Sequence, residues 1–194
     1  MEVAVLHSAG VDPEQELLAD HDVFVVRELL SAAECQAFIE EVEAEGFEDA
    51  PLSTSQGAVR DESVRNNTRV MRDREDWAEA LWERVAGLDL PWCEGREPLA
   101  LNERFRFYRY DPGQFFAPHY DGFFRRAGQM SFYTVMVYLN DDFSGGETAF
   151  EMLDIDVVPE VGMGLLFFHD LLHEGRPVEA GRKYVLRTDL MYAD

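Results

Sequence analysis

Apolar residues in the first half of the chain recur with the period of a helix, after one short continuous apolar run. That run, Val23–Val26, predicts a buried strand. Ser31 and Glu34 follow it and form a capping box, in which each side chain satisfies a free backbone amide at the start of a helix. Gly46 supplies the stop signal of the same helix. Between these signals, the apolar positions at helical spacing are Cys35, Phe38, Ile39 and Val42.

A second helix is predicted to begin near Asp73, where the helical period returns. The polar segment Pro51–Asn67, between the two helices, shows neither period and is predicted to be a loop. Residues 1–22 are mixed and acidic and are expected to form a loosely held lead-in. The residues along the buried side of the second helix are Trp77, Leu81, Arg84, Val85 and Leu88.

After Asn102 the period changes from about 3.6 to about 2, which is typical of strands. Turn signals rich in glycine and proline separate the strands, and several short strands at such spacing indicate a β-sandwich or barrel. We expect one domain, 1–194, in which residues 1–101 supply a strand and helical support and residues 102–192 the β core. The β-rich runs are Arg104–Tyr110, Met130–Asn140, Gly164–His169 and Lys183–Tyr192.

Composition narrows the classes of function. The 194 residues hold 39 acidic and 17 basic side chains, a net charge of −22, which argues against nucleic-acid and anionic-membrane partners. No apolar run approaches the roughly 18 residues of a membrane helix, and the N-terminus lacks the basic flank of a secretion signal. Cys35 and Cys93 fit neither a disulfide framework nor a zinc site, and Cys35 is expected to be buried. A cytoplasmic protein is the resulting expectation.

Basic residues gather in one short stretch of this acidic chain, from Arg60 to Arg74. Two interpretations stay open for this cluster. It could bind a negatively charged or peptide substrate, or its members could pair with the acidic residues beside them. The arginines are Arg60, Arg65, Arg69, Arg72 and Arg74, and the acidic neighbours are Asp61, Glu62, Asp73 and Glu75.

One of the five histidines stands in a pattern that suggests metal binding. Asp121 follows His119 by two residues, and in a strand such residues point to the same face. His173 is the candidate for a third ligand from a distant strand. Two histidines and one carboxylate leave open positions on Fe(II), which an oxygen-activating enzyme needs. His169, four residues before His173, is a rival for the third ligand; that spacing suits a helix, whereas its segment reads as a strand.

At these motifs the sequence resembles a known family. The segments are RYDPGQFFAPHYDG, SFYTVMVYLNDDFSGGETAF and HEGRPVEAGRKYVLRTDLMY. In order and spacing they are similar to the prolyl 4-hydroxylase-like branch of the 2-oxoglutarate and Fe(II)-dependent dioxygenases. The resemblance implies a mainly β fold with flanking α structure, a double-stranded β-helix (jelly roll) preceded by N-terminal supporting helices. It also places the third metal ligand at His173, which implies a structural role, or one supporting the site, for His169.

The resemblance further implies a cosubstrate site. Lys183 lies ten residues after His173, where similar hydroxylases place the base that pairs with the distal carboxylate of 2-oxoglutarate. Lys183 is also the single lysine in a chain with 16 arginines, which weakens its interpretation as an ordinary exposed lysine. Tyr110 and Tyr138 match positions where family members offer a tyrosine hydroxyl to the cosubstrate. Arg187 shares strand parity with Lys183, so it is a second candidate for binding the cosubstrate in the same cavity, and a salt bridge on the barrel is the alternative for it.

Thr134 is a further candidate for this cavity. Four phenylalanines are expected to pack the mouth of the barrel. They are Phe115, Phe116, Phe123 and Phe124.

The resemblance implies hydroxylation of an unactivated C–H bond with release of succinate and CO2. Fe(II) is the implied metal, 2-oxoglutarate and O2 are the cosubstrates, and ascorbate is a candidate reductant. The expected substrate is a prolyl residue in a peptide or protein, or a related amino acid, with Arg65, Asn67 and Arg69 as candidate substrate contacts. The alternatives are a facial-triad oxygenase of small molecules that does not use 2-oxoglutarate, and a non-catalytic jelly-roll sensor of a metal or small acid. The oligomeric state is left open.

Overall fold

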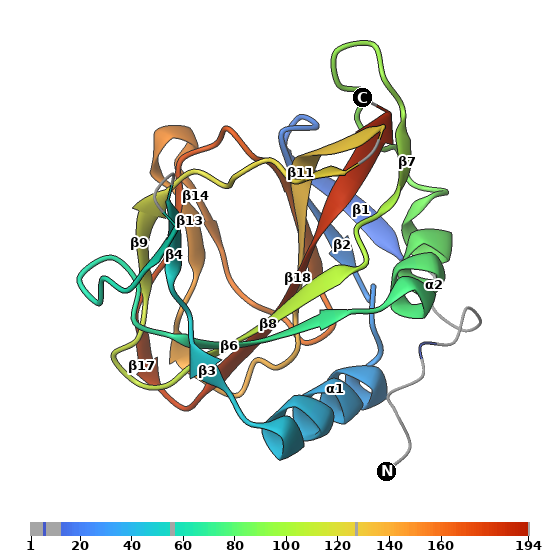
Figure 1. Ribbon diagram of the computed structural model, residues 1–194. Helices are drawn as coiled ribbons and strands as arrows, with labels where there is room; N and C mark the ends of the chain where they lie inside the picture. Colours follow the sequence, from blue (N-terminus) through green and yellow to red (C-terminus); the bar gives the residue numbers. More distant parts are fainter. Residues whose placement is uncertain (1–5, 7–12, 55–56, 127, 194) are drawn as a thin grey trace.

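The computed structural model describes residues 6, 13–54, 57–126 and 128–193. In this part of the chain two main antiparallel sheets form a double-stranded β-helix, and both helices pack outside it (Figure 1). The expected jelly roll with helical support is therefore confirmed. Neither helix in the described ranges is long and apolar enough to cross a membrane. The helices are α1 (Ala32–Glu45) and α2 (Glu75–Val85), with one 3-10 turn at Glu151–Leu153.

The large sheet has the strand order β1-β2-β15-β11-β18-β8-β6-β3, with β10 pairing to β11 and β7 to β18. Its long central strands are those that the alternating pattern predicts. The sheet comprises β1 (Glu14–Ala19), β2 (Val23–Arg27), β3 (Glu48–Asp49), β6 (Thr68–Asp73), β7 (Pro98–Leu101), β8 (Arg104–Tyr110), β10 (Arg125–Arg126), β11 (Gln129–Tyr138), β15 (Gly164–Phe168) and β18 (Lys183–Ala193).

The small sheet has the order β14-β13-β16-β9 and faces the large one across the barrel (Figure 1). Its strands have three or four residues each, which is too short for a period to emerge from the sequence. They are β9 (Phe116–His119), β13 (Thr148–Phe150), β14 (Ile155–Val157) and β16 (His173–Gly175). Two further pairs join β12 (Ser144–Gly145) to β17 (Val178–Ala180) and β4 (Leu52–Thr54) to β5 (Gly57–Val59).

Alternation along the strands divides the apolar side chains between two cores. Phe105 and Phe107 of β8 point outward and meet Phe38 of α1 and Trp77 of α2. The Phe38 and Trp77 rings meet edge to face with centroids 4.9 Å apart, a favourable aromatic geometry. The intervening Tyr108 points into the barrel with Tyr110, where a second core lies. The helices therefore cover the outer face of the sheet, and its inner face lines the interior of the barrel.

Both ends of α1 match the sequence prediction. The Ser31 side chain accepts a hydrogen bond from the Glu34 amide, the Glu34 carboxylate accepts one from the Ser31 amide, and Gly46 caps the C-terminus at φ 90°. The predicted start of α2 is two residues early, because Asp73 still pairs with Arg104 as the last residue of β6. Leu88 lies beyond the end of the helix.

Two predictions about irregular segments are wrong. Within residues 1–22, Glu14–Ala19 form β1, an edge strand whose pairing with β2 satisfies the backbone despite its polar sequence. Residues 1–5 and 7–12 lie outside the described residues. The segment Pro51–Asn67, expected to be a loop, contains the β4–β5 hairpin. The two strands of that hairpin have three residues each, which is too short for an alternation of polar and apolar residues to be recognised in the sequence.

Candidate active site

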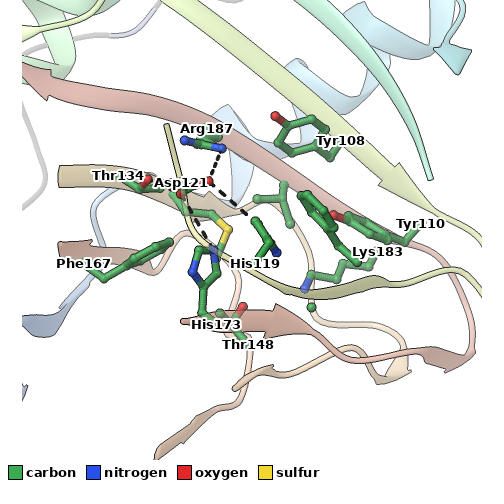
Figure 2. Close-up of a pocket in the computed structure, with 14 residues that line it drawn as sticks. Tyr108, Tyr110, His119, Asp121, Thr134, Thr148, Phe167, His173, Lys183 and Arg187 are labelled. Carbon is green, nitrogen blue, oxygen red and sulfur yellow. Dashed lines mark hydrogen bonds and ion pairs between the residues drawn. The ribbon is translucent and has the colours of Figure 1, made fainter. Parts of the chain in front are cut away.

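A cavity lies inside the barrel between the two sheets, and all three predicted metal ligands line it together with Lys183 and Arg187 (Figure 2). Figure 2 shows the histidines and Asp121 grouped together, with Lys183 beside Tyr110 to one side of them. The cavity is lined by residues from β8, β11, β15 and β18 of the large sheet and from β9, β13 and β16 of the small one.

The three metal-ligand candidates meet because two short strands pair. His119 ends β9, His173 begins β16, and the two residues are partners in the antiparallel register. Asp121 lies beyond the end of β9, so the expectation that an intact strand places it on the face of His119 is wrong in detail. The Asp121 amide instead donates to the His169 carbonyl at 3.1 Å, which turns its side chain toward the histidines. One ligand atom from each residue lies within 4.8 Å of the others.

Hydrogen bonds fix the orientation of both imidazoles. Nδ1 of His119 donates to the Ala117 carbonyl at 2.8 Å, and Nδ1 of His173 donates to the Leu171 carbonyl at 2.9 Å. Each ring therefore presents the Nε2 lone pair to the third member of the cluster, with Nε2 3.8 Å from an oxygen of Asp121 in both cases. This arrangement is typical of metal-binding histidines, whose second nitrogen is held by a backbone carbonyl or carboxylate.

Electrostatics keep these groups in the forms that bind a metal. Burial, reinforced by His173, lowers the pKa of His119 to about 3, and burial also lowers the pKa of His173. Burial alone would raise the pKa of Asp121, but Arg187 and the two histidines outweigh it and hold that pKa well below its usual range. Two neutral imidazoles and one carboxylate fit a divalent transition metal with open positions.

Lys183 is a buried cation without a carboxylate partner in the described part of the chain. It is 3% exposed, and its ammonium donates to the Gly146 carbonyl at 2.6 Å. The rings of Tyr110 and Tyr138 lie 5.4 and 5.3 Å from its nitrogen. Burial lowers the pKa of Lys183 to about 7, which Glu147 only partly opposes. The cavity therefore ends in a cation that an entering anion would stabilise.

The predicted tyrosines differ in their surroundings. Tyr110 lines the cavity, and burial raises its pKa to about 12, so its hydroxyl stays protonated. Tyr138 is fully buried and donates to the Thr148 hydroxyl at 2.7 Å. Thr148 lines the cavity and Tyr138 does not figure among the lining residues, so the tyrosine supports the wall through Thr148.

Arg187 lines the cavity, but its guanidinium already forms ion pairs with two carboxylates. Its Nη1 lies 2.8 Å from Asp121 Oδ1 (Figure 2). Its Nη2 lies 3.5 Å from Asp189 Oδ1. Nε of Arg187 is buried without a hydrogen-bond partner among the described residues. The Arg187 guanidinium thus faces a metal-ligand candidate directly.

The three candidate substrate contacts separate in space. Arg65 is buried with its guanidinium 4.5 Å from the Tyr108 ring and 4.3 Å from the Phe116 ring, both of which line the cavity. Asn67 is also buried and accepts from Nε of Arg65 at 2.7 Å. Arg69 instead lies near Glu48, with 3.4 Å between Nε and Oε1, and is not a lining residue of the cavity.

The remaining arginines of the cluster pair with acidic residues, as in one of the two interpretations; among the described residues two of the four partners lie two positions away in the sequence and two lie farther off. Arg60 pairs with Asp49 and Glu62, Arg72 with Glu45, and Arg74 with Asp76.

Several lining residues were missed by the sequence analysis. Tyr108 and Met136 each precede a recognised tyrosine by two positions on its strand, so strand parity could have found them. Phe167 packs edge-on against His173 with ring centroids 4.4 Å apart. Thr148 carried no signal, because its strand has only three residues.

His169 is not a cluster member. It is fully buried, and its ring nitrogens bond to the hydroxyls of Ser131 and Thr134, in keeping with the role favoured from the sequence. Of the predicted aromatic cluster, Phe116 lines the cavity, while Phe123 is 52% exposed.

Comparison with known proteins agrees with this geometry. Residues 105–188 match the 2OG-Fe(II) oxygenase superfamily. A putative prolyl 4-hydroxylase of Acanthamoeba polyphaga mimivirus is 26% identical over 183 residues, covering 84% of this chain and 71% of the relative. Probable prolyl 4-hydroxylase 3 of Arabidopsis thaliana is 26% identical over 195 residues, covering 83% of this chain and 66% of the relative.

Solved structures show the same fold. The viral collagen prolyl hydroxylase of Paramecium Bursaria Chlorella virus-1, in complex with 2-oxoglutarate, superposes with a TM-score of 0.60 at 21% identity, covering 89% of this chain and 97% of that one. A prolyl hydroxylase of Trichoplax adhaerens, in complex with a hypoxia inducible factor peptide fragment, gives 0.66 at 18% identity, covering 90% and 84%. The match over residues 105–188, the similarity to prolyl 4-hydroxylases and the His–Asp–His cluster together support a prolyl 4-hydroxylase-like 2OG-Fe(II) oxygenase, with Fe(II) as its metal and 2-oxoglutarate and O2 as cosubstrates.

Proposed function

We propose that the protein hydroxylates a prolyl residue in a peptide or protein. The observation that carries the proposal is the meeting, in one cavity, of a His–Asp–His cluster and a buried lysine that has no carboxylate partner among the described residues. The first suits Fe(II), and the second suits the far end of a dicarboxylate cosubstrate. The prolyl hydroxylases among the relatives support the choice of substrate class.

His119, Asp121 and His173 would hold Fe(II) and leave its other positions open. Fe(II) bound there supplies the oxidising chemistry by which 2-oxoglutarate and O2 become succinate and CO2 and a substrate C–H bond becomes C–OH. The residues of the chain itself orient the metal-binding side chains and exclude water. The backbone carbonyls that hold both Nδ1 atoms keep the Nε2 atoms directed inward, and the phenylalanine walls around the histidines exclude solvent.

Lys183 would bind the distal carboxylate of 2-oxoglutarate. Arg187 faces Asp121 and Asp189, so Lys183 is the cation left for the cosubstrate. Tyr110, whose ring lies 5.4 Å from the Lys183 nitrogen, and Thr148 both line the cavity, and their hydroxyls would be donors to that carboxylate. A charged pair buried at this depth is favourable only when hydrogen bonds satisfy its remaining atoms, and these hydroxyls meet that requirement.

A peptide is favoured over a small molecule by the surroundings of the cluster. Tyr120 lies between two ligand candidates in the chain and is 59% exposed, and the nearby Phe123 is 52% exposed. Aromatic surfaces are typical docking sites for proline-containing segments, whose extended conformation loses little entropy on binding. Arg65 adds a buried Nη2 without a hydrogen-bond partner among the described residues, a donor suited to a peptide carbonyl.

The test is an anaerobic Fe(II) and 2-oxoglutarate loading followed by exposure to O2 with a panel of prolyl peptides, matched peptides with alanine for proline, and free L-proline. We expect succinate release that a prolyl peptide stimulates, with one oxygen atom added to that peptide and none to its alanine match. Hydroxylation of free proline alone would contradict the peptide substrate. Absence of 2-oxoglutarate-dependent turnover with every substrate, together with absence of 2-oxoglutarate binding, would contradict the reaction itself.

A further inference from the structure

A chain of buried polar side chains lies behind the carboxylate of Asp121. The Thr134 hydroxyl donates to Asp121 Oδ2. Nδ1 of His169 lies 3.2 Å from that hydroxyl, and Nε2 of His169 lies 2.9 Å from the hydroxyl of Ser131. Ser131, Thr134 and His169 are each fully buried. None of the three belongs to the His119–Asp121–His173 cluster.

The positions of the protons in this chain follow from its chemistry. An ionised carboxylate only accepts, so the single Thr134 proton is directed to Asp121. The Thr134 oxygen must then accept from His169, which places the imidazole proton on Nδ1. Nε2 of His169 is left as the acceptor and takes the Ser131 proton, while the Ser131 oxygen accepts the Phe124 amide at 2.8 Å. Each of these polar groups therefore has a hydrogen-bond partner, and from Ser131 through His169 and Thr134 every hydrogen bond is donated in the direction of Asp121.

His169 also holds the backbone of Asp121. Its carbonyl accepts the Asp121 amide at 3.1 Å, and its own amide donates to the Phe132 carbonyl at 2.8 Å. The exposed Phe123 lies edge-on to the His169 ring, with centroids 5.6 Å apart. One residue therefore contacts the main chain of Asp121 directly, its side chain through Thr134, and an aromatic residue of the segment that follows Asp121.

The strand that carries both hydroxyls is distorted to make this chain possible. Ser131 and Thr134 are three residues apart on β11, so a regular strand would point them to opposite faces. The pairing of β11 with β18 shifts register between Ser131 and Tyr133, where Phe132 is the extra residue. This bulge brings both hydroxyls to the same imidazole. Bulges beside active sites commonly re-aim a side chain in this way.

We propose that His169 is a positioning residue for the metal site, which fixes the Asp121 carboxylate through Thr134 and through its own backbone. The proposal rests on the function proposed above, because it assumes that Asp121 binds a metal. Groups that orient a metal ligand through a hydrogen bond commonly change metal affinity 10- to 100-fold when they are removed.

Two substitutions at His169 distinguish positioning from packing. The amide of His169→Asn can place its N–H where Nδ1 stands, so it can still donate to Thr134. The longer His169→Gln places its amide near the Nε2 position and loses that donor. Thr134→Val removes the hydroxyl with little change of shape, and Thr134→Ser retains it. These four variants are compared with the wild-type protein.

The measurement is the dissociation constant for Mn(II), from the electron paramagnetic resonance signal of the free ion, without 2-oxoglutarate or turnover. We expect about 10- to 100-fold weaker binding for His169→Gln and Thr134→Val, and binding close to that of the wild type for His169→Asn and Thr134→Ser. Urea unfolding of the metal-free proteins checks that each variant is folded. If a His169 variant is not folded, the comparison of Thr134→Val with Thr134→Ser still tests the proposal.

Equal Mn(II) affinities within each pair of variants would overturn the positioning role while leaving the proposed function intact. Failure of the wild-type protein itself to bind Mn(II) would overturn the proposed function, and this inference with it.

Discussion

Replacing Lys183 by methionine separates the contribution of this residue to cosubstrate binding from its effect on folding. Methionine fills a similar volume without the charge. In the protein without cosubstrate, burial lowers the Lys183 pKa from 10.5 to about 7. At about 1.4 kcal/mol per pH unit, the folded state disfavours the charged lysine by about 5 kcal/mol. The lysine therefore destabilises the cosubstrate-free protein and is stabilised only when an anion pairs with it.

The sign of the pH dependence follows from this pKa. Because the folded-state pKa lies below the unfolded one, the unfolded chain binds more protons between about pH 7 and 10.5, and wild-type stability rises with pH across that window. Urea unfolding of the cosubstrate-free proteins should show Lys183→Met at least as stable as the wild type. Its advantage should grow as the pH falls from 10 to 7. A loss of stability that is independent of pH would refute this reasoning.

The effect on binding should be opposite and large. Removing one partner of a buried ion pair costs about 3–5 kcal/mol, so the dissociation constant for 2-oxoglutarate should rise by roughly 100- to 4,000-fold. Isothermal titration with Mn(II) in place of Fe(II) measures it. Arg182→Met is the matched control, because Arg182 is 47% exposed and pairs with Asp111 outside the cavity. Unchanged 2-oxoglutarate affinity in Lys183→Met would refute the assignment.

Two further predictions concern stability. Ser31→Ala removes the side-chain half of the capping box of α1 and should lower the free energy of unfolding by about 1 kcal/mol in urea; an unchanged value would show that the cap does not stabilise the helix. Gly162→Ala should destabilise by more than about 2 kcal/mol, because Gly162 has φ +77° and a Cβ there would lie 1.9 Å from the Leu30 carbonyl oxygen. Gly87→Ala, which meets nothing within 4 Å, is the control and should change stability by less than about 0.5 kcal/mol; equal effects at both glycines would contradict the steric explanation.

The sequence was most informative where local signals are strong. The alternation of Arg104–Tyr110 predicted β8 with the bounds that the structure has, and the Ser31 capping box predicted the start of α1. Both depend on physics within a few residues: side chains alternate along a strand, and free amides at a helix end need acceptors. The three ligand candidates were found by motif and family resemblance.

The pairing that assembles the site could not be predicted in this way. His119 and His173 come together because β9 pairs with β16, and neither strand is long enough to show a period. The position of Asp121 depends on a hydrogen bond to His169, far away in the sequence. Among the arginines of one cluster, composition does not distinguish Arg65, which stacks between two rings, from Arg69, which pairs at the surface of the sheet. These differences arise from tertiary contacts.

The most direct test of the central claim is turnover in ¹⁸O₂ with a prolyl peptide that the protein accepts, followed by mass spectrometry of both products. A 2-oxoglutarate-dependent hydroxylase divides the O2 molecule, so one labelled oxygen is expected in succinate and one in the hydroxylated peptide. Asp121→Ala, which removes the carboxylate of the cluster, should give neither product. Equal turnover by Asp121→Ala, or a peptide that gains no oxygen while wild-type protein consumes 2-oxoglutarate, would contradict the account.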